Sequence, residues 1–564
     1  MARLRSNPVG AVLSCWWLCH SLVAGDFTVT SDLDAYEKLA DDNNGFPHQT
    51  FRSSDIKGPV FHINHWDKNL TDDTPYIFIG TNYGKIGAGA GPMIIDASDL
   101  SLVYADQSYT NNYHSEMQTI HDKPHLTYWA KDRDLGGVHV VVDENYNKKY
   151  NATAVSPHYE DMHEFHVTNE GTAVFTTHHR IDFDCSLWGG SSSCHVHDTG
   201  FQEVDLETNE VLFGWWAADH FDPADSYARF VAGDFGLNSE REGNYDLSHM
   251  NGTEDGNYLI SSRHFFSVQL IDGKTGEPIW TLGGKKNSFT DLSNGSATNI
   301  GWQHNARFYH NHSQITLFDN HNENQGDCGD HCETRGLHVE IDTKEMTARV
   351  IREYYHPGHL DSGAMGGMQL LDSGNAIVGW GWTPSIVEYA SDGQVAMDIQ
   401  RGKVGIGRQG NMFMYRVNKG HWTGRPTWPP SFVVDEDDGN ATIYMSWNGA
   451  TDIVKWFIFS SEQSDKVNDI EHLFTAPRTG FETSASIKAD ELSRFVRVAA
   501  VDKAGSVLGV SDVFDRQAEY TDDVASGDAD GRIKISSLAI GSIFAILLIT
   551  FSTAFGLLIY RRRR

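Results

Sequence analysis

The chain has few cysteines, a deficit of basic residues, and no long amphipathic helical pattern. Six cysteines in 564 residues exclude a small scaffold that is held together mainly by disulfides. Lys and Arg number 44 against 76 Asp and Glu, which gives a formal net charge of −32. We therefore expect no nucleic acid as a partner, because phosphate backbones attract the opposite charge. The length favours one large domain and at least one smaller one.

Long uncharged runs occur only towards the two ends of the sequence. Residues 1–25 contain two arginines, an apolar run and a small-residue end, which is typical of a secretory signal peptide. Residues 535–560 carry no charge and are long enough for a single transmembrane helix. Because RRRR follows at 561–564, we expect this tail to be cytoplasmic and the bulk of the protein to be extracellular or lumenal, as in a type I membrane protein. A lipid-anchor signal is the alternative, and the terminal arginines count against it.

This location predicts disulfides and glycosylation. Four cysteines remain after the signal peptide, and we expect two local pairs, Cys185 with Cys194 and Cys328 with Cys332; a four-thiolate metal site is the alternative. Sequons that we expect to be modified lie at Asn69, Asn151, Asn294, Asn311 and Asn440.

Short β-branched and aromatic runs between turn signals indicate an all-β protein. One unit recurs, an apolar strand that ends near Asp, a polar turn and a second strand. Its copies are centred on Asp96, Asp143, Asp205, Asp272, Asp342 and Ala390, at intervals of 47 to 70 residues. Six such hairpins predict a six-bladed β-propeller over residues 26–424, with each hairpin at the outer side of a blade. Unrelated hairpins of a β-sandwich are the alternative.

A different organisation begins after the linker-like sequence GRPTWPP at 424–430. Alternating strands over residues 425–515 predict an immunoglobulin-like or fibronectin type III β-sandwich. Residues 516–534 are polar and read as a disordered stalk that leads to the transmembrane helix.

Four strings rich in histidine and arginine carry the chemistry. They are DMHEFHV with His163 and His166, YDLSHMN with His249, LISSRH with Arg263, and GWQHNARF with His304. If these strings form inner strands of neighbouring blades, their side chains converge on the channel of the propeller. Arg and protonated His bind the oxygens of a sulfuryl or phosphoryl group, and a neutral imidazole can attack it. The alternative is that His304 is a core residue that bonds a carbonyl group.

The order of motifs resembles the eukaryotic, mostly fungal branch of the arylsulfotransferase family. The motifs are HEF, HMN, LISSRH, IWTLGGK, WQHNARF, TLFDN and GNAIVGWGWTPSIVEYASDG, and they cover roughly residues 75–425. SWNGAT and TGFET, nearer the C-terminus, are also similar to the tail of those chains. The resemblance implies a six-bladed propeller that moves a sulfuryl group from a phenolic sulfate to a phenol through a sulfohistidine. It also implies that neither a nucleotide donor nor a cofactor is needed.

The same resemblance assigns roles to individual residues. His304 in WQHNARF matches the nucleophile of the family. His249 and Arg263 match the groups that hold the sulfuryl oxygens and assist proton transfer, and His163 matches the remaining channel histidine. Asn251 matches a substrate-binding amide.

The chain departs from the family directly after Asn251. Gly252 and Thr253 stand where a serine would be more usual, and the change creates a sequon at Asn251. A glycan at Asn251 would be incompatible with a buried active site, so we expect this sequon to be unmodified.

No pattern predicts a metal or a nucleotide. His163 with His166, and Cys194 with His195 and His197, have metal-like spacing, but no further ligand is spaced to complete a site. GGKKNS at 283–288 does not fit a phosphate-binding loop. The remaining alternatives are a non-catalytic propeller that binds an anionic, sulfated ligand, and a hydrolase that passes the sulfuryl group to water.

Overall fold

The computed structural model describes residues 29–81, 89–132, 136–184, 186, 192–227, 247–252, 256–322, 332–404, 413–467 and 471–518. Its contacts divide the chain into one compact unit over residues 1–514 and a second over residues 515–564. The expected signal peptide and transmembrane helix both fall outside the described residues. Among the residues that are described, no helix is long and apolar enough to cross a membrane.

The predicted all-β class is confirmed. In the described part of the chain the only α-helix is α1 (Leu33–Asp42), which begins where the Asp32 carboxylate accepts the Ala35 N–H at 3.0 Å. Short 3₁₀ turns occur at Ala217–Asp219, Pro223–Asp225, Arg263–Phe265 and Ala489–Glu491. The remaining elements are strands.

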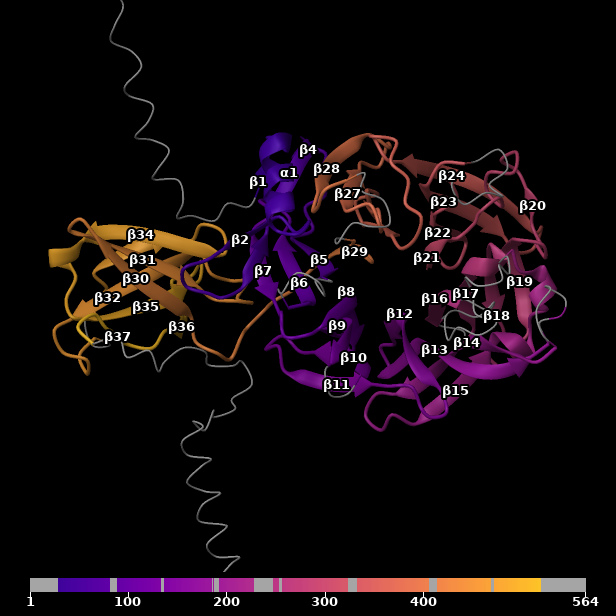
Figure 1. Cartoon of the computed structure of the whole chain (residues 1–564), viewed down its shortest axis with the longest axis horizontal. Coiled ribbons are helices and arrows are strands. Elements are labelled where there is room, and N and C mark those ends of the chain that lie inside the picture. Colours follow the sequence, from indigo (N-terminus) through magenta and orange to yellow (C-terminus); the bar gives the residue numbers. More distant parts are fainter. Residues whose placement is uncertain are drawn as a thin grey trace, which may run out of the picture. The chain divides into compact units, whose positions relative to one another are not determined.

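Six sheets have antiparallel four-stranded cores, and most strands pair with their neighbours in sequence (Figure 1). The first three sheets comprise β29 (Val417–Gly420), β5 (Tyr76–Thr81), β6 (Gly91–Asp96) and β7 (Leu102–Ala105); β8 (Asn111–Ile120), β9 (Lys123–Asp132), β10 (Gly136–Val142) and β11 (Lys148–Ala152); and β12 (Tyr159–Val167), β13 (Thr172–Phe183), β14 (Cys194–Asp205) and β15 (Val211–Trp216).

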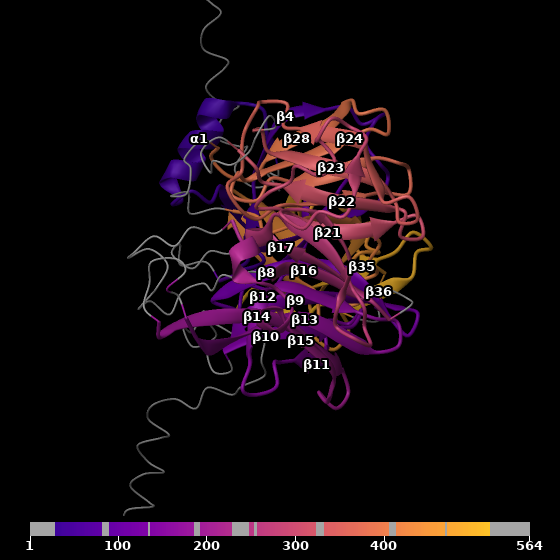
Figure 2. The same ribbon diagram turned by 90° about the vertical axis from the view of Figure 1, so that its right-hand side faces the viewer.

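The next three sheets continue this order along the chain. They comprise β16 (Leu247–Gly252), β17 (Tyr258–Ser262), β18 (Ser267–Ile271) and β19 (Pro278–Gly283); β21 (His304–Tyr309), β22 (Gln314–Asp319), β23 (Arg335–Asp342) and β24 (Thr347–Tyr355), extended by β20 (Thr290–Asp291); and β25 (Gly367–Leu370), β26 (Ala376–Gly379), β27 (Ser385–Tyr389) and β28 (Val395–Gln400), extended by β4 (Phe61–Trp66) and β1 (Val29–Thr30). A separate pair is β2 (His48–Thr50) with β3 (Lys57–Pro59). Figure 2 shows β24, β23, β22 and β21 in their sheet order.

One edge strand of each sheet contacts the corresponding strands of its two neighbours, in cyclic order. The contacts run from β29 to β8, β12, β16, β21, β25 and back to β29. We refer to these six as the inner strands. In Figure 1 the labels of β29, β8, β12, β16 and β21 surround a common centre, whereas β11, β15 and β24 lie at the outside. The cycle closes through long-range pairings, because β29 pairs with β5 and β28 pairs with β4.

The recurrent hairpins predicted from the sequence are the two strands farthest from the inner strand in each four-stranded core. Their turns share one hydrogen bond, in which an Asp side chain accepts the backbone N–H two residues on. The bond is present at Asp96, Asp143, Asp205, Asp272 and Asp342. In the sixth hairpin, where Ala390 occupies the Asp position, Asp392 accepts the Gln394 N–H instead.

The hydrophobic core lies between neighbouring sheets. One cluster joins Leu259 and Val268 of the fourth sheet to Leu317 and Val339 of the fifth. Comparable clusters occur between the other sheets, so each sheet buries both faces against its neighbours. This packing leaves the edges of the inner strands directed towards one another.

The C-terminal strands form two further sheets with one shared core. The sheets comprise β30 (Ser431–Asp437), β31 (Asn440–Ser446) and β34 (Glu482–Lys488); and β33 (Phe474–Pro477), β32 (Lys455–Ser461), β35 (Phe495–Val501), β36 (Val507–Val510) and β37 (Phe514–Asp515). Ile443, Trp456 and Val498 are buried together between them. The predicted boundary near residue 425 falls inside the first compact unit, and it stays a prediction.

The structure describes only some of the residues that we expect to be modified. All five asparagines that we expect to be glycosylated, from Asn69 to Asn440, are exposed. Cys332 is disulfide-bonded. Cys185 and Cys328 lie outside the described residues, as does the side chain of Cys194 at the start of β14, so both pairings stay predictions.

Candidate functional site

Four consecutive inner strands have a shifted register where they carry histidines. The shifts lie between Tyr113 and Glu116 of β8, Glu160 and Phe165 of β12, Leu247 and His249 of β16, and His304 and Arg307 of β21. A bulge redirects the side chains around it and is common beside active sites. These shifts therefore mark the region where the predicted residues gather.

Two bulge residues have backbone conformations that non-glycine residues rarely adopt. His114 has a φ of 55° and Asn305 has a φ of 56°. Each such residue costs on the order of 1–3 kcal/mol and persists only where the surroundings hold it. The Oδ1 atom of Asn305 accepts the Met368 N–H at 3.1 Å, which fixes the inner end of β21 against β25.

His304, the first residue of β21, is 3% exposed and makes two defined hydrogen bonds. Its Nδ1 lies 2.6 Å from Asn320 Oδ1, and its Nε2 accepts the Met365 N–H at 3.1 Å. The Asn320 amide nitrogen donates to the carbonyl groups of Ser362 and Met365, so Oδ1 faces the imidazole. His304 is therefore a neutral imidazole with its proton on Nδ1, and its Nε2 lone pair is hydrogen-bonded in this structure.

Arg263 lies on the neighbouring fourth sheet, in the 3₁₀ turn after β17. Its guanidinium carbon is 4.9 Å from the centre of the Trp302 ring, and its Nη1 is 3.3 Å from Nε2 of His264. The Gln303 amide nitrogen donates to the backbone carbonyl groups of Ser262 and Ser267. Residues 302 and 303 thus connect the Arg263 turn with the strand that begins at His304.

His249 and Asn251 lie on β16, the inner strand of the same sheet as Arg263. Their backbones pair with Ser261 and Leu259 of β17. Their side chains are outside the described part of the chain, so the predicted contacts to a sulfuryl group stay predictions.

His163 lies within the register shift of β12 and forms a pair with a carboxylate. Its Nδ1 is 2.7 Å from Oδ2 of Asp161, and 25% of its side chain is accessible. Although burial raises the pKa of Asp161, the charge of His163 and its hydrogen bond outweigh this effect and hold the pKa below the usual range. The carboxylate thus stays ionised beside the imidazole.

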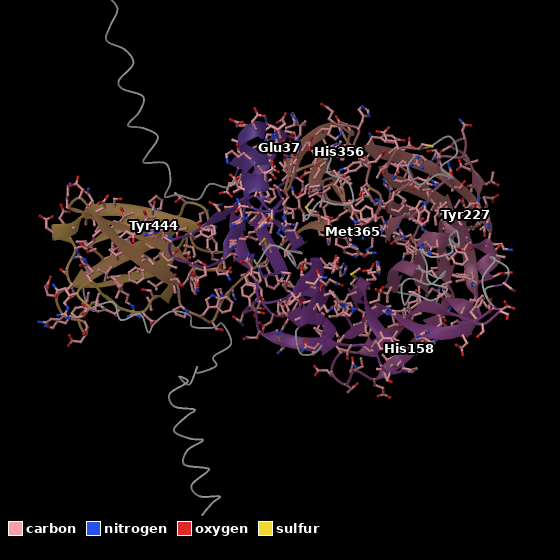
Figure 3. All side chains as sticks on the ribbon, in the orientation of Figure 1. Glu37, His158, Tyr227, His356, Met365 and Tyr444 are labelled. Carbon is pink, nitrogen blue, oxygen red and sulfur yellow. The ribbon has the colours of Figure 1, made fainter. Side chains whose placement is uncertain are left out.

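His163 and His304 are linked through Tyr415 and Met365. The rings of His163 and Tyr415 are 6.2 Å apart, and the Tyr415 hydroxyl donates to the His163 carbonyl oxygen at 2.8 Å. Met365 packs in the same cluster as Tyr415 and donates its N–H to His304. Met365 lies among the inner strands, near the middle of the cycle of sheets (Figure 3). The two predicted histidines are thus connected through the Tyr415 ring and the Met365 segment.

A buried group of charged residues lies next to these histidines on the same inner strands. We refer to His114, Glu116, Glu164, Arg307 and Arg416 as the charged cluster. Arg416 binds both oxygens of Glu164 at 3.0 Å, and Arg307 binds Oε1 of Glu164 at 3.0 Å. Such bidentate, charge-assisted bonds are among the strongest in proteins.

The protonation states within the charged cluster follow from its geometry. Arg416 donates to Nδ1 of His114 at 2.6 Å, and Nε2 of His114 donates to the Phe165 carbonyl oxygen. Burial and the nearby arginine lower the pKa of His114 far below its usual value, so this imidazole is neutral. Burial raises the pKa of Glu116 to about 7. The side chains of Glu116 and Arg307 remain 17% and 16% accessible.

The sequence analysis did not identify the charged cluster, although it quoted two of its members. Glu164 adjoins His163 in HEF, and Arg307 belongs to WQHNARF. His114 in YHSE lies at the register shift of another inner strand, a feature that the sequence alone does not reveal. Arg416 carried no signal, because its partners are about 250 and 300 residues away in sequence.

His163 of the metal-like pair belongs to this region, whereas the side chains of Cys194, His195 and His197 lie outside the described part of the chain. Among the residues that the structure describes, no group of three or more His, Cys, Asp or Glu side chains could hold a metal ion. Lys285 of GGKKNS donates to the carbonyl oxygens of Ala224 and Ser226, at the edge of a cavity of about 220 Å³ beside β18 and β19. None of the predicted site residues lines that cavity.

Comparison with known proteins identifies one family. The family model described as arylsulfotransferase (ASST) matches residues 116–402, which are 287 of the 564 residues. This range contains the inner strand residues from Glu116 to Met368. No curated protein is detectably similar in sequence.

Solved structures share little more than a general arrangement of strands. They include a protein of unknown function from Bacteroides caccae (13% identity, TM-score 0.36, 61% of this chain and 98% of that chain) and the Kuenenia stuttgartiensis hydrazine synthase (11%, 0.32, 58% and 81%). A protein from Lactobacillus plantarum matches with 11% identity and a TM-score of 0.33 over 73% of this chain and 99% of that chain.

Proposed function

Because this chain belongs to the arylsulfotransferase family, we propose that it moves a sulfuryl group from a phenolic sulfate ester to a phenol through a sulfohistidine on His304. The family match over half of the chain is the observation that carries the proposal. The gathering of His304, His163 and Arg263 on adjoining sheets supports it.

We further propose that the six sheets form a six-bladed β-propeller and that the C-terminal sheets form an immunoglobulin-like sandwich. The cyclic contacts of the inner strands support the first part, and the shared core of two sheets supports the second. A eukaryotic, fungal-type member in the secretory pathway, held by one membrane helix, fits the sequence patterns at both ends and the exposed sequons.

In the first half of the reaction, Nε2 of His304 attacks the sulfur atom and the bond from sulfur to the phenolic oxygen breaks. In the second half, the oxygen of another phenol attacks the sulfur and the bond from nitrogen to sulfur breaks. Asn320 holds Nδ1 and so keeps the ring oriented. Arg263, together with His249 and Asn251, would bind the sulfuryl oxygens.

This reaction requires a local rearrangement, because Nε2 of His304 accepts the Met365 N–H. The donor must displace that bond before the lone pair can attack. Met365 and Gly366 both have positive φ values, 63° and 99°, so this segment is in an uncommon conformation. We propose that donor binding moves this segment.

The same hydrogen bond favours a second candidate function, a non-catalytic protein that binds an anionic, sulfated ligand. A histidine with both nitrogens bonded is typical of a structural residue. In that case the protein would bind an aryl sulfate and release it unchanged.

Intact-protein mass spectrometry after exposure to 4-nitrophenyl sulfate separates the two candidates. The proposal predicts a mass gain of one sulfuryl group that is discharged by added phenol and absent in His304→Ala. His338→Gln, a change in the same sheet away from the site, serves as the control and should still be labelled. Binding without labelling or nitrophenol release would favour the non-catalytic protein.

A further inference from the structure

We propose that Asp161 is a positioning residue that keeps His163 protonated and so makes it the proton donor for the departing phenol. This inference rests on the proposed sulfuryl transfer. It goes beyond that function because it divides the chemistry between two histidines and brings in a carboxylate that no motif had indicated.

The first support is the geometry of the pair. Oδ2 of Asp161 lies 2.7 Å from Nδ1 of His163, within the register shift between Glu160 and Phe165. The side chains are 14% and 25% accessible, so the carboxylate is the more sheltered partner and the imidazole the more exposed one. Since Nδ1 faces the carboxylate, Nε2 is the nitrogen that can exchange a proton with a ligand.

The second support is the rigid backbone around the pair. The His163 carbonyl oxygen accepts hydrogen bonds from Arg416 and from the Tyr415 hydroxyl, each at 2.8 Å. The Glu164 N–H donates to the Thr176 hydroxyl oxygen at 3.2 Å. The peptide group that joins His163 to Glu164 is thus held at both its carbonyl oxygen and its N–H, which restricts the backbone next to the imidazole.

The third support is the contrast with His304. Nδ1 of His304 bonds a neutral amide oxygen, whereas Nδ1 of His163 bonds an ionised carboxylate. A carboxylate stabilises an imidazolium much more than an amide does. His304 is thus suited to a neutral nucleophile and His163 to a protonated acid, and such divergent environments are how one site carries both roles.

The groups around His163 are consistent with this division. His178 of β13 interacts electrostatically with Asp161. Tyr415 and Arg416, from the segment before β29, contact His163. The charge of Arg416 is balanced by the bidentate bond to Glu164. Asp161 is therefore an ionised partner in direct contact with the imidazole, where it stabilises the protonated form.

The proposed step balances without another reactant. As the bond from His304 Nε2 to sulfur forms, the electron pair of the breaking bond goes to the phenolic oxygen, which takes the proton from His163 Nε2. In the return step the acceptor phenol gives its proton to His163 as its oxygen bonds sulfur, and the pair in the nitrogen–sulfur bond returns to His304.

The basicity of the leaving phenol provides the test. 4-Nitrophenolate leaves readily without a proton, whereas unsubstituted phenolate needs one. We expect Asp161→Asn in the full-length protein to lower kcat/KM for phenyl sulfate, which reports only the first half of the reaction, by about 10²- to 10³-fold, the usual size of a general-acid effect. The same ratio for 4-nitrophenyl sulfate should fall only a few-fold. His163→Gln should show the same selectivity, and the double variant should be no worse than His163→Gln.

A matched control and a rescue variant identify a merely structural effect. Asp198→Asn changes another buried carboxylate of the same sheet, one that accepts the Ala218 N–H. It should lower kcat/KM for both donors equally or not at all. Asp161→Glu, which keeps the charge, should recover part of the phenyl sulfate activity.

The outcomes are distinguishable. An equal loss for both donors in Asp161→Asn would overturn the role of Asp161 while leaving the proposed function intact. A wild-type protein that turns over neither donor would overturn the proposed function and, with it, this inference. If Asp161→Asn fails to fold, the donor selectivity of His163→Gln and Asp161→Glu decides the question.

Discussion

Two groups of residues alternate along the same inner strands and have different environments. The side chain of His163 is 25% accessible and His304 is bonded to Met365, whereas Glu164 and Arg416 are at most 1% exposed. His163 and Glu164 are even adjacent in sequence, yet one faces Tyr415 and the other is enclosed by two arginines. The local geometry of the strand thus places neighbouring polar side chains in different surroundings.

We expect the charged cluster to contribute mainly to the stability of the fold, and we propose that the histidines contribute mainly to turnover. Removing one member of a buried ion pair leaves the other charge unpaired, which is costly. Removing a hydrogen bond from a candidate nucleophile should mainly affect the reaction. The following variants separate these effects.

The largest effect is expected for Arg416→Met. This change removes the bidentate partner of Glu164 and should lower the free energy of unfolding by about 3–5 kcal/mol. Arg349→Met, which breaks an exposed pair with Glu340, should cost at most about 1 kcal/mol. Denaturant unfolding of both variants checks this, and equal stabilities would refute the architectural role of the cluster.

A smaller effect, on rate, is expected for Asn320→Leu. The change removes the partner of His304 Nδ1 and leaves that nitrogen without its acceptor, which costs about 1–3 kcal/mol. The rate of sulfuryl labelling per folded molecule should fall about 10- to 100-fold. Burst kinetics with 4-nitrophenyl sulfate measure it, and Asn375→Leu, which alters a buried amide near Leu70, is the control. A similar loss in both variants would argue against a specific role.

Acid should destabilise the fold through its buried histidines. Burial lowers the pKa of His139 to about 3 and that of His166, His338 and His356 to about 4. Because the unfolded chain takes up these protons near pH 6.5 and the folded chain does not, stability is retained above pH 6.5 and falls as the pH drops towards 4.

Two buried carboxyl groups oppose that loss between pH 7 and 4.5. The pKa values of Glu116 and Asp198 are raised to about 7, so the folded state takes up their protons first. These four histidines and His114, whose pKa is also lowered, outnumber the two carboxyl groups, so stability should still fall below about pH 6.5. Unfolding measured from pH 8 to pH 4.5 should show this loss at the acid end of the range.

One histidine variant sharpens the pH prediction. His139 is buried and stacks on Phe165 and Phe175. His139→Phe should therefore raise stability at pH 5 and reduce the slope of stability against pH by about one proton. An unaltered slope in His139→Phe would contradict the assignment.

The smallest effects are expected at the exposed sequons. Substituting Gln at Asn69 or Asn151 should change the electrophoretic mobility of the secreted protein but neither its turnover nor its unfolding temperature, because both side chains lie on the surface. Unchanged mobility in every sequon variant would contradict glycosylation and, with it, the secretory route.

The hairpins were predictable because their information is local. An Asp side chain bonds its own turn two residues on, so each copy leaves a pattern in sequence, and even the exception at Ala390 keeps a turn through Asp392.

The charged cluster and the pairing of Asp161 with His163 were not predictable in the same way. Arg416 reaches Glu164 only because the C-terminal β29 closes the cycle of sheets beside β8 and β12. The register shift in β12, which sets the direction of Asp161, depends on its pairing with β13 and has no residue signature of its own. Long-range closure and bulges therefore set the limit of what the sequence reveals.

The central claim is that His304, and not His163, carries the sulfuryl group. The direct test is to trap the protein with 4-nitrophenyl sulfate, digest it at mild alkaline pH and locate the added mass by tandem mass spectrometry. The account predicts modification within GWQHNARF, at His304. A sulfuryl group on His163, or on any residue outside the inner strands, would contradict it.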